Sequence, residues 1–473
     1  MSQWLPISEI AEQVRAGQLK AVDLVEKALK TIDGKKEYQA IVATTAERAR
    51  QRAASVDAMV ADGKEAGKLA GVPFIAKDNF LVFGAETTAA SNMLKGFNAP
   101  YQSTAIEKLE SEGAICVAKA NLDAFAHGSS TENSDFFTTK NPHDVTRVPG
   151  GSSGGSAAAV VLDMAPFALG TDTGGSIRQP ASFTGSVGLK PTYGLVSRSG
   201  VVAMASSTDV IGPITRTVQD TATVLDVIAG RDPLDSTTIE SDKNGYAKIS
   251  TDVAGKKIGV VREYMGEGVD PGVKTQVQQG LKALEKAGAE LVEISLPSLP
   301  LALAVYYIVV PAELSSNLSR YDGQRYQSSA ADAKDLDESY SKSRGNGFGR
   351  EAKRRIMIGT YVLSHGYYDA YYRKAQLVRT KLIKEFEAAF QKVDFLAGPV
   401  VPTTAFKIGS HTEDPLQMYL SDIMTVAVSL AGIPAISVPS GLSDGMPVGL
   451  QIVAPFGQDV KLLGAAKAVE ENL

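Results

Sequence analysis

Cysteine is almost absent from this sequence, and histidine is scarce. The 473 residues include one cysteine, Cys116, and four histidines. A single cysteine cannot build a disulfide framework, and it leaves too few soft ligands for a Cys/His metal site. We therefore expect no metal site. Cys116 lies in an apolar run, residues 114–118, which predicts a strand position where the thiol packs as a small buried hydrophobic group.

An excess of basic charge and long apolar runs are also missing. The formal net charge is −5, which gives no basic footprint for nucleic acid, so a partner chain would have to hold any nucleic acid involved. The longest apolar candidate, residues 301–312, is too short to span a bilayer, and residues 1–10 contain no apolar signal core. These absences predict a cytoplasmic protein that does not enter a membrane.

Short apolar runs alternate with helical patterns over most of the chain, which predicts an α/β fold with a sheet covered on both faces. Residues 1–65 show helical spacing, so we expect an N-terminal helical arm there, followed by one compact domain over residues 66–473. Strands are expected at 72–76, 115–118, 167–170, 258–261, 290–294, 395–397, 435–438 and 449–453. Helices are expected at 103–112, 156–164, 218–229, 271–287, 367–393, 418–430 and 459–472. The polar stretch 324–349 predicts an exposed insertion.

Two glycine-rich loops that carry serines lie between residues 148 and 192. The first is Gly150-Gly151-Ser152-Ser153-Gly154-Gly155-Ser156, before an Ala-rich helix, and the second includes Thr173-Gly174-Gly175-Ser176, after an apolar strand. Glycine lets peptide N–H groups come close to a ligand. The second loop can therefore aim several donors at one point, as an oxyanion hole requires. Ser176 would then be placed to attack a carbonyl carbon held there.

Other interpretations of these loops remain open. Gly/Ser stretches are often plain surface loops. A glycine loop before a helix can cradle phosphate, but neither a Gly-Lys-Ser/Thr ending nor a spaced G-x-G-x-x-G after a strand is present. Gly150-x-Ser152-x-Gly154 matches the nucleophile-elbow pattern by letter, yet the proline-broken residues 141–149 replace the strand that an elbow needs. Ser153 and Ser156 are expected to cap the helix or to form loop hydrogen bonds.

A serine nucleophile needs a base, and the histidines stand in unpersuasive contexts; they are His127, His143, His365 and His411. A lysine can serve as the base when burial lowers its pKa toward neutrality. Lys77 directly follows the apolar strand expected at 72–76 and is the candidate. The competing interpretation of Lys77 is an ordinary solvated lysine.

Together these segments resemble the amidase signature family. The resemblance rests on residues 150–159, residues 170–188 and the strand that ends at Lys77, and it extends over essentially the whole chain. It implies one large α/β domain around a mixed, twisted sheet. It also implies a relay in which Ser176 is the nucleophile, Ser152 on a cis peptide carries the proton, and Lys77 is the neutral base. The remaining implied residues are Thr173, Gly174 and Gly175, whose N–H groups with that of Ser176 form the oxyanion hole, and the supporting residues Asp172 and Arg178.

The sequence is most similar to the glutaminase subunits of tRNA-dependent amidotransferases, through residues 130–134, 315–323, 347–356 and 366–372. That resemblance implies release of ammonia from glutamine for transfer to Glu-tRNA(Gln) or Asp-tRNA(Asn). The glutamine carboxylate would bind Arg355 and its ammonium Asp422, and Tyr306 or its neighbour Tyr307 would line the pocket. The implied partners are the B and C subunits of a heterotrimer. This chain would hold no cofactor; a partner would hold the tRNA and use ATP and Mg²⁺.

The sequence departs from that pattern at Ala124 and His127, where the similar subunits usually carry Glu and Met, and at Val210, where a polar residue is usual. These positions bear on the glutamine pocket or the ammonia route rather than on the relay. Two rival functions are a stand-alone amidase of small or fatty amides and a non-catalytic binding scaffold. The charged pair Arg355 and Asp422 argues against the first, and the intact serine–lysine set argues against the second.

Overall fold

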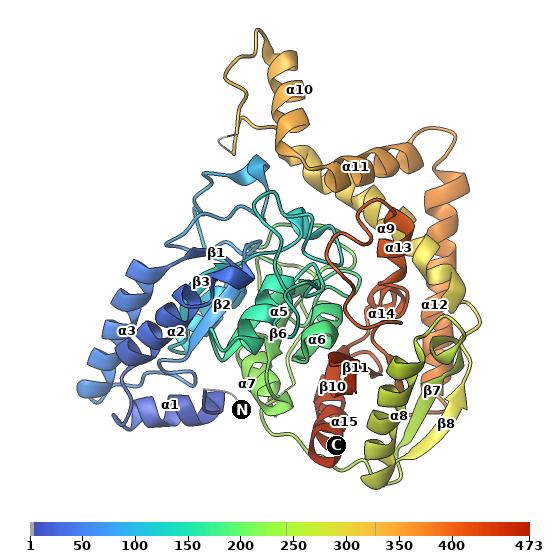
Figure 1. The fold of residues 1–473 in the computed structure, drawn as a ribbon, viewed down its shortest axis with the longest axis horizontal. Coiled ribbons are helices and arrows are strands. Elements are labelled where there is room, and N and C mark those ends of the chain that lie inside the picture. The colour runs from blue at the N-terminus through green and yellow to red at the C-terminus, as the bar shows by residue number, and fades with distance from the viewer. Residues whose placement is uncertain (1–3, 243, 327) are drawn as a thin grey trace.

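A computed structural model describes residues 4–242, 244–326 and 328–473 (Figure 1). Three parts of the chain lie outside the described residues: positions 1–3, position 243 and position 327. Position 327 falls within the insertion predicted at 324–349, and positions 1–3 fall within the stretch 1–10 discussed above. Within the described part, strands form one sheet in the order β1-β3-β2-β4-β6-β5-β10-β11-β9-β7-β8. The strands are β1 (Ile41–Thr44), β2 (Pro73–Lys77), β3 (Ile115–Ala120), β4 (Phe167–Asp172), β5 (Val187–Lys190), β6 (Val210–Thr215), β7 (Lys257–Val261), β8 (Glu290–Ile294), β9 (Phe395–Pro399), β10 (Ala435–Ser443) and β11 (Met446–Val453).

The sheet is mixed, as expected. β2 runs parallel to β3 and β4, and β7 runs parallel to β8 and β9. The pairs that join these two parallel groups through β6, β5, β10 and β11 are antiparallel. Every residue of β2, β4, β6 and β11 is buried. Since successive side chains of a strand point to opposite faces, helices and loops cover both faces at the centre of the sheet.

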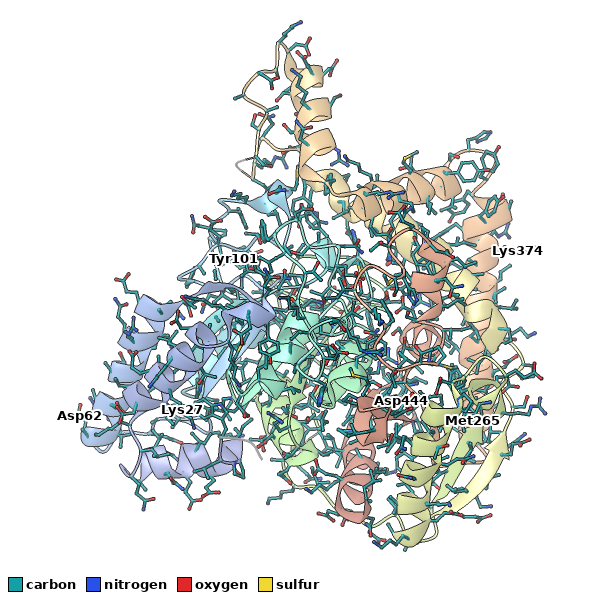
Figure 2. The ribbon with its side chains drawn as sticks, in the orientation of Figure 1. Lys27, Asp62, Tyr101, Met265, Lys374 and Asp444 are labelled. Atoms are coloured by element: carbon teal, nitrogen blue, oxygen red, sulfur yellow. The ribbon has the colours of Figure 1, made fainter. Side chains whose placement is uncertain are left out.

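The helices surround this sheet (Figure 1), and Figure 2 shows side chains throughout the space between the elements, with Asp62 and Lys374 at the margins of the molecule. Their bounds are α1 (Ile7–Arg15), α2 (Ala21–Asp33), α3 (Ala46–Ala61), α4 (Thr104–Ser111), α5 (Gly154–Val161), α6 (Arg178–Thr184), α7 (Val218–Ile228), α8 (Pro271–Lys286), α9 (Ala302–Asn317), α10 (Leu336–Gly347), α11 (Arg350–Leu363), α12 (Lys374–Phe390), α13 (Pro415–Leu420), α14 (Val426–Ala431) and α15 (Asp459–Asn472).

The predicted strands are all present, but β1, β5 and β6 were not predicted. β6 contains Gly212 and Pro213, which disfavour strand structure when they are judged locally. β5 has only four residues. β1 lies within residues 1–65, where only helices were expected, and pairs antiparallel with β3 at the edge of the sheet. The expectation of an all-helical N-terminal segment is wrong at this strand, because pairing with β3 decides its structure.

Helix ends follow local signals where a cap is present. α8 begins at Pro271, as predicted, because the Asp270 side chain accepts hydrogen bonds from the N–H groups of Gly272 and Val273. The helix expected at 418–430 is wrong as a single element. α13 ends at Leu420 and α14 begins at Val426, and the turn between them contains Asp422 and Thr425. Because the helix is interrupted here, Asp422 and Thr425 lie in a turn and not on the surface of a continuous helix.

The apolar run 301–312, for which no helix was predicted, lies mostly in α9, which continues to Asn317. The helical stretch Leu299–Arg320 has a mean hydropathy of 1.5 over its most apolar window, and half of that window is buried within the protein. α9 packs against α11, α12 and α14, as a core helix does. A Cβ atom at Gly359 of α11 would lie 1.9 Å from the carbonyl oxygen of Pro311. Gly359 therefore allows α11 to approach α9 at backbone distance.

The polar stretch around residue 336 forms an exposed element, as predicted. α10 begins at Leu336, where the Asp335 side chain accepts a hydrogen bond from the N–H of Glu338. Figure 1 shows α10 projecting beyond the body of the domain.

Candidate active site

Lys77 is the last residue of β2, and its side chain is fully buried. Its Nζ atom lies 2.8 Å from Ser152 Oγ, 2.9 Å from Ser153 Oγ and 2.9 Å from Thr171 Oγ1. Burial lowers the pKa of Lys77 to about 7, although the charges of Asp123, Asp172 and Asp209 oppose this shift. The amine is therefore partly uncharged at neutral pH and can accept a proton.

The hydroxyl groups around Lys77 differ in the acceptor to which each can donate its hydrogen bond. Ser153 donates to the carbonyl oxygen of Thr171 at 3.2 Å, so it accepts from Lys77. A neutral amine has two N–H donors and one lone pair, so one of its three hydroxyl neighbours can donate to it. Ser152 is available for that role. The Lys77–Ser152 contact is thus a path for a proton to reach the base.

Ser152 follows a cis peptide bond, Gly151–Ser152. The segment before it is held by neighbouring side chains. Gln179 accepts a hydrogen bond from the N–H of Gly151 at 2.8 Å and donates to the carbonyl oxygen of Ser129 at 2.9 Å. Thr131 donates to the carbonyl oxygen of Gly150 at 2.7 Å. These contacts fix the backbone from which the Ser152 hydroxyl reaches Lys77.

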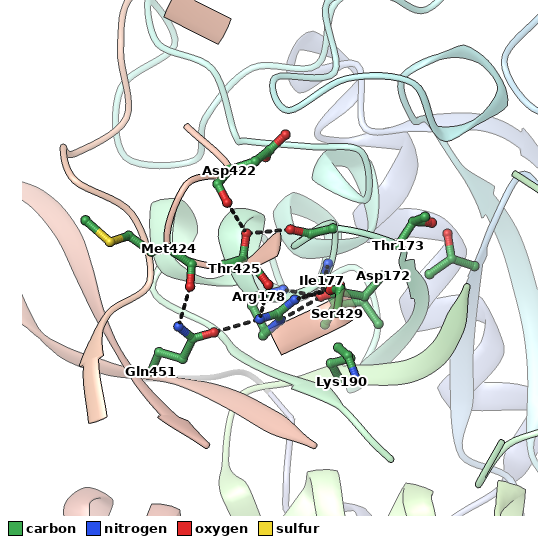
Figure 3. Close-up of polar contacts among 12 residues, drawn as sticks. Asp172, Thr173, Ile177, Arg178, Lys190, Asp422, Met424, Thr425, Ser429 and Gln451 are labelled. Atoms are coloured by element: carbon green, nitrogen blue, oxygen red, sulfur yellow. Dashed lines mark hydrogen bonds and ion pairs between the residues drawn. The ribbon is translucent and has the colours of Figure 1, made fainter. Parts of the chain in front are cut away.

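The loop that carries Ser176 is anchored by a buried ion pair (Figure 3). Arg178 donates from Nε and Nη2 to the two carboxylate oxygens of Asp172, both at 2.9 Å, and neither side chain is exposed. Burial raises the pKa of the Asp172 carboxyl, but the Arg178 guanidinium outweighs it and holds the pKa below its usual value. Arg178 also donates to Gln451 at 2.7 Å and to Ser429 at 2.9 Å. The pair therefore ties the loop between β4 and α6 to β11 and α14.

The two glycine-rich loops are in direct contact, because the N–H of Ser153 donates to the carbonyl oxygen of Ser176 at 3.1 Å. No hydrogen bond joins the Ser176 and Ser152 hydroxyl groups among the described residues, so only the Lys77–Ser152 part of the predicted relay is made. The Thr173 hydroxyl donates to Asp209 at 2.7 Å. In the same part of the chain, the N–H groups of Gly174, Gly175 and Ser176 have no hydrogen-bond acceptor, as an oxyanion hole without its ligand would show.

Glycine is required where this loop meets its neighbours. A Cβ atom at Gly174 would lie 2.5 Å from the hydroxyl end of the Tyr306 ring, and one at Gly175 would lie 2.3 Å from the Thr425 hydroxyl. Gly175 also has a φ of 145°, in the range that favours glycine. Tyr306, on α9, therefore packs directly on the loop that carries the candidate oxyanion-hole N–H groups.

Arg355 and Asp422 lie beside this loop and are linked through Tyr307. Asp422 accepts hydrogen bonds from Ser129 at 2.8 Å and from the Tyr307 hydroxyl at 3.0 Å. The Arg355 guanidinium lies 5.2 Å from the centre of the Tyr307 ring, within range of a cation–π contact. Thr425 donates to the carbonyl oxygens of Asp422 and Gly174. A cation, an anion and the candidate oxyanion loop are thus part of one contact network.

The charges of this network are buried. Burial raises the pKa of Asp422 to about 6, although the hydrogen bonds from Ser129 and Tyr307 oppose this shift. Arg355 is only 3% exposed and donates from Nε to Glu351 at 2.7 Å. Its two terminal nitrogens have no hydrogen-bond acceptor within the described residues. They remain available for a ligand such as a carboxylate.

Comparisons with known proteins identify the family of this chain. The family model described as Amidase matches residues 23–463. The chain belongs to the amidase signature family. The A subunit of glutamyl-tRNA(Gln) amidotransferase from Caldanaerobacter subterraneus subsp. tengcongensis is 52% identical to this chain over 469 residues, which are 99% of this chain and 96% of the relative.

Solved structures of amidases share the whole fold. The crystal structure of the A subunit of glutamyl-tRNA(Gln) amidotransferase from Thermotoga maritima is 41% identical, with a TM-score of 0.81, and the match covers 98% of this chain and 94% of that one. A bacterial aryl acylamidase of the amidase signature family is 25% identical, with a TM-score of 0.87, and the match covers 99% and 96% of the two chains. The predicted α/β fold and family are confirmed.

The predicted site residues of this amidase chain fall into two groups. The first contains Lys77, Ser152, Ser176 and the loop Thr173–Gly175. The second contains Tyr306, Arg355 and Asp422. The two groups meet where Tyr306 packs on Gly174 and where Thr425 contacts Gly174. Within the second group, Tyr307 is the tyrosine that donates to Asp422.

Several residues of the amidase site were not predicted from the sequence. Ser153 was expected to cap α5 or to form loop hydrogen bonds. Its side chain makes no cap but does hydrogen-bond the Thr171 backbone, and its contact with Lys77 was not predicted. Thr171 and Asn79 complete the surroundings of Lys77, since Asn79 donates to Thr171 Oγ1 at 3.1 Å. The sequence signal that could have indicated the contact of Ser153 with Lys77 is its position next to Ser152 in the glycine-rich loop. Thr171 lies just beyond the predicted strand 167–170, and no sequence signal linked it to Lys77.

A cavity of about 260 Å³ with a mixed polar and apolar lining adjoins this network. Its polar lining includes Asn79, Thr171, Thr173, Arg198, Asp209 and Arg320. Asn79 and Thr171 therefore separate the buried Lys77 amine from this space. Among the described residues, no group of three or more His, Cys, Asp or Glu side chains is placed to hold a metal ion.

Proposed function

We propose that this chain is the glutamine-hydrolysing subunit of a tRNA-dependent amidotransferase. The observation that carries the proposal is the position of Arg355 and Asp422, two buried opposite charges beside the loop of Ser176. Free glutamine has a carboxylate and an ammonium group next to its reactive amide, and each needs an opposite charge in a buried site. The relative that is 52% identical is named as the A subunit of glutamyl-tRNA(Gln) amidotransferase, which supports the same substrate.

In the first half of the reaction, Ser176 Oγ attacks the side-chain amide carbon of glutamine. Its proton passes to Ser152, and the proton of Ser152 passes to the neutral amine of Lys77. The negative charge on the carbonyl oxygen is stabilised by the N–H groups of Thr173 to Ser176. Collapse of this intermediate breaks the carbon–nitrogen bond. Protonated Lys77 returns a proton through Ser152, and ammonia leaves.

In the second half, water attacks the acyl group on Ser176. The same relay removes a proton from the water and returns one to Ser176 Oγ, which releases glutamate. Lys77 can act as base and as acid because its pKa is about 7. The hydrogen bond between Lys77 and Ser152 supports this relay directly. The step between Ser152 and Ser176 requires their hydroxyl groups to come into hydrogen-bond distance when substrate binds.

We further propose that ammonia is used on a partner, within a heterotrimer with B and C subunits. The partner would hold Glu-tRNA(Gln) or Asp-tRNA(Asn) and would carry out the chemistry that needs ATP and Mg²⁺. The net charge of −5 supports the assignment of tRNA to another chain. A cytoplasmic location fits this use of charged tRNA.

The rival function is a stand-alone amidase of small or fatty amides. Its support is the similarity of the fold to that of the aryl acylamidase. Burying the charges of Arg355 and Asp422 costs desolvation free energy in the free enzyme. A substrate without charges would gain nothing from them, so their presence argues against the rival function.

Hydrolysis of glutamine and of butanamide by the purified chain, alone and co-expressed with candidate B and C subunits, separates the two functions. We expect glutamine to be preferred, with ammonia and glutamate released in equal amounts, and Ser176→Ala to abolish both products. A clear preference for butanamide over glutamine, in the presence of the partners, would refute the proposal. Co-purification of a tRNA-binding subunit with the chain from native extract tests the partnership itself.

A further inference from the structure

His127 has no role in the function proposed above, yet it lies fully buried in the protein. Neither of its ring nitrogens has a hydrogen-bond partner among the described residues. Buried polar side chains are nearly always hydrogen-bonded, because an unpaired one has lost its water without replacement. An imidazole with both nitrogens unpaired therefore indicates that a partner is missing from the free protein.

The backbone around His127 is fixed. Asp123 accepts hydrogen bonds from the N–H groups of Thr131 at 2.9 Å and Asn133 at 3.0 Å. The Asn133 side chain donates to the carbonyl oxygen of His127 at 2.9 Å. Two residues after His127, Ser129 donates to Asp422. The unpaired imidazole thus belongs to the same rigid loop that positions one of the two charges of the glutamine site.

Arg355 is the charged group that acts on His127. Burial, and after it the positive charge of Arg355, lowers the pKa of His127 well below its usual value. The imidazole is therefore neutral, with one N–H donor and one acceptor nitrogen. Arg355 itself uses only Nε for a hydrogen bond in the described part of the chain. Both side chains consequently keep unused hydrogen-bond donors, and the loop of His127 is connected to the tyrosine that Arg355 contacts, because Ser129 and Tyr307 both donate to Asp422.

We propose that His127 donates a hydrogen bond to the α-carboxylate of the substrate beside Arg355 and so determines specificity in the glutamine site. This inference rests on the proposed function and adds a residue to it. A carboxylate offers two oxygens and about four acceptor positions, so the two terminal nitrogens of Arg355 leave room for another donor. A neutral donor adds this contact without placing a second positive charge next to Arg355.

The first test compares His127→Met with His127→Gln. Methionine fills a similar volume without a donor, and glutamine restores one. We expect kcat/KM for L-glutamine, divided by kcat/KM for butanamide, to fall about tenfold in His127→Met, mainly through KM. In His127→Gln most of the ratio should return. An unchanged ratio in His127→Met would overturn the proposal.

The second test measures stability and binding. In the absence of glutamine, His127→Met should melt at the same temperature as the wild type or higher, since it removes an unpaired buried polar group. A lower melting temperature would reveal a structural partner and contradict the proposal. In a Ser176→Ala background, the dissociation constant of L-glutamine, measured by calorimetry, should rise about tenfold on adding His127→Met.

Failure of this inference is distinguishable from failure of the proposed function. A wild-type protein that hydrolyses butanamide but not glutamine contradicts the proposed function. A wild-type protein that hydrolyses glutamine, with a His127→Met variant of unchanged ratio, contradicts only the role of His127.

Discussion

Lys77, Ser152 and Thr171 come from strands and a loop at the centre of the sheet, whereas Arg355 and Asp422 come from a helix and a turn beside it. The Lys77 group is held by short hydrogen bonds between fully buried atoms. The Arg355 group also has hydrogen bonds, from Ser129 and Tyr307 to Asp422 and from Arg355 to Glu351, but it depends in addition on a ring contact with Tyr307 and on helices that meet through Gly359. We propose that the two groups have separate tasks. The Lys77 group carries out amide cleavage, which needs fixed proton transfers. The Arg355 group recognises the amino acid, and its geometry depends on how α9 and α11 pack.

The two groups also differ in charge at neutral pH. Burial lowers the pKa of Lys77 to about 7 and raises that of Asp422 to about 6. Near pH 7 the base is therefore partly neutral while the carboxylate is mostly ionised. Changes in the Lys77 group should affect all amide substrates, and changes in the Arg355 group should affect glutamine most. The following predictions test this difference.

Ser176→Ala should have the largest effect. Loss of the nucleophile should lower kcat by about 10⁴-fold or more for glutamine and for butanamide alike. The variant should keep the thermal stability of the wild type, because no hydrogen bond from the Ser176 hydroxyl to Ser152 is lost. Ser156→Ala, at the start of α5, is the matched control, since the one hydrogen bond of the Ser156 side chain within the described residues goes to the carbonyl oxygen of Leu169. Comparable losses in both variants would contradict the assignment of the nucleophile.

Lys77→Ala should lower kcat by about 10³-fold for both substrates, because the general base is lost. Lys77→Arg should be similarly inactive, since a guanidinium stays protonated. Lys190 is the matched control: burial also lowers its pKa to about 7, but it donates to the carbonyl oxygens of Pro191 and Ile433. Lys190→Met should retain the pH profile of the wild type. Near-normal turnover in Lys77→Ala would exclude it as the base.

Asp422→Asn should raise the KM for glutamine by about 10- to 100-fold, because the ammonium group loses its charged partner. Butanamide has no ammonium group, so its kcat/KM should change far less. Steady-state kinetics with both amides measure the difference. Equal effects on the two substrates would show that Asp422 supports the fold of the site rather than glutamine binding.

The dependence of kcat/KM on pH should differ between substrates. Lys77 acts as a base only when neutral, so activity should fall about tenfold per pH unit below its pKa of about 7. Asp422 must be ionised to bind ammonium, so below about pH 6 glutamine should lose activity more steeply than butanamide. Asp422→Asn should abolish that extra slope. Parallel profiles for the two substrates in the wild type would contradict the separation of the two groups.

Gly359→Ala should have the smallest effect on catalysis and act through packing. The added Cβ would lie 1.9 Å from the carbonyl oxygen of Pro311, so α11 must shift, at a cost of about 1–3 kcal/mol in the free energy of unfolding. Since α11 carries Arg355, the KM for glutamine should rise modestly. Gly345→Ala, on exposed α10 with nothing within 4 Å of the added Cβ, is the control and should not lower the melting temperature.

The sequence singled out the two glycine-rich loops because their signals are local. Glycine density around Ser152 and Ser176, and a lysine at the end of an apolar strand, indicate chemistry without knowledge of contacts. The substrate residues required the family resemblance, since nothing near Arg355 or Asp422 in the chain distinguishes them from surface charges. We propose that residues 1–65 act as an arm on the domain of residues 66–473. The strand β1 in that arm could not be predicted, because its partner β3 lies more than seventy residues away.

Composition and periodicity determined that this chain folds as an α/β protein, and the glycine-rich loops together with the family resemblance made a serine, rather than a metal or a histidine, the candidate centre of its chemistry. Only the tertiary structure decided that Lys77 contacts Ser152, Ser153 and Thr171, and that a turn separates α13 from α14 at Asp422. It also decided that His127 is buried with no hydrogen-bond partner for its ring in the described part of the chain. The physical reason is burial: a side chain's pKa and its unmet hydrogen bonds depend on neighbours brought together from distant parts of the chain.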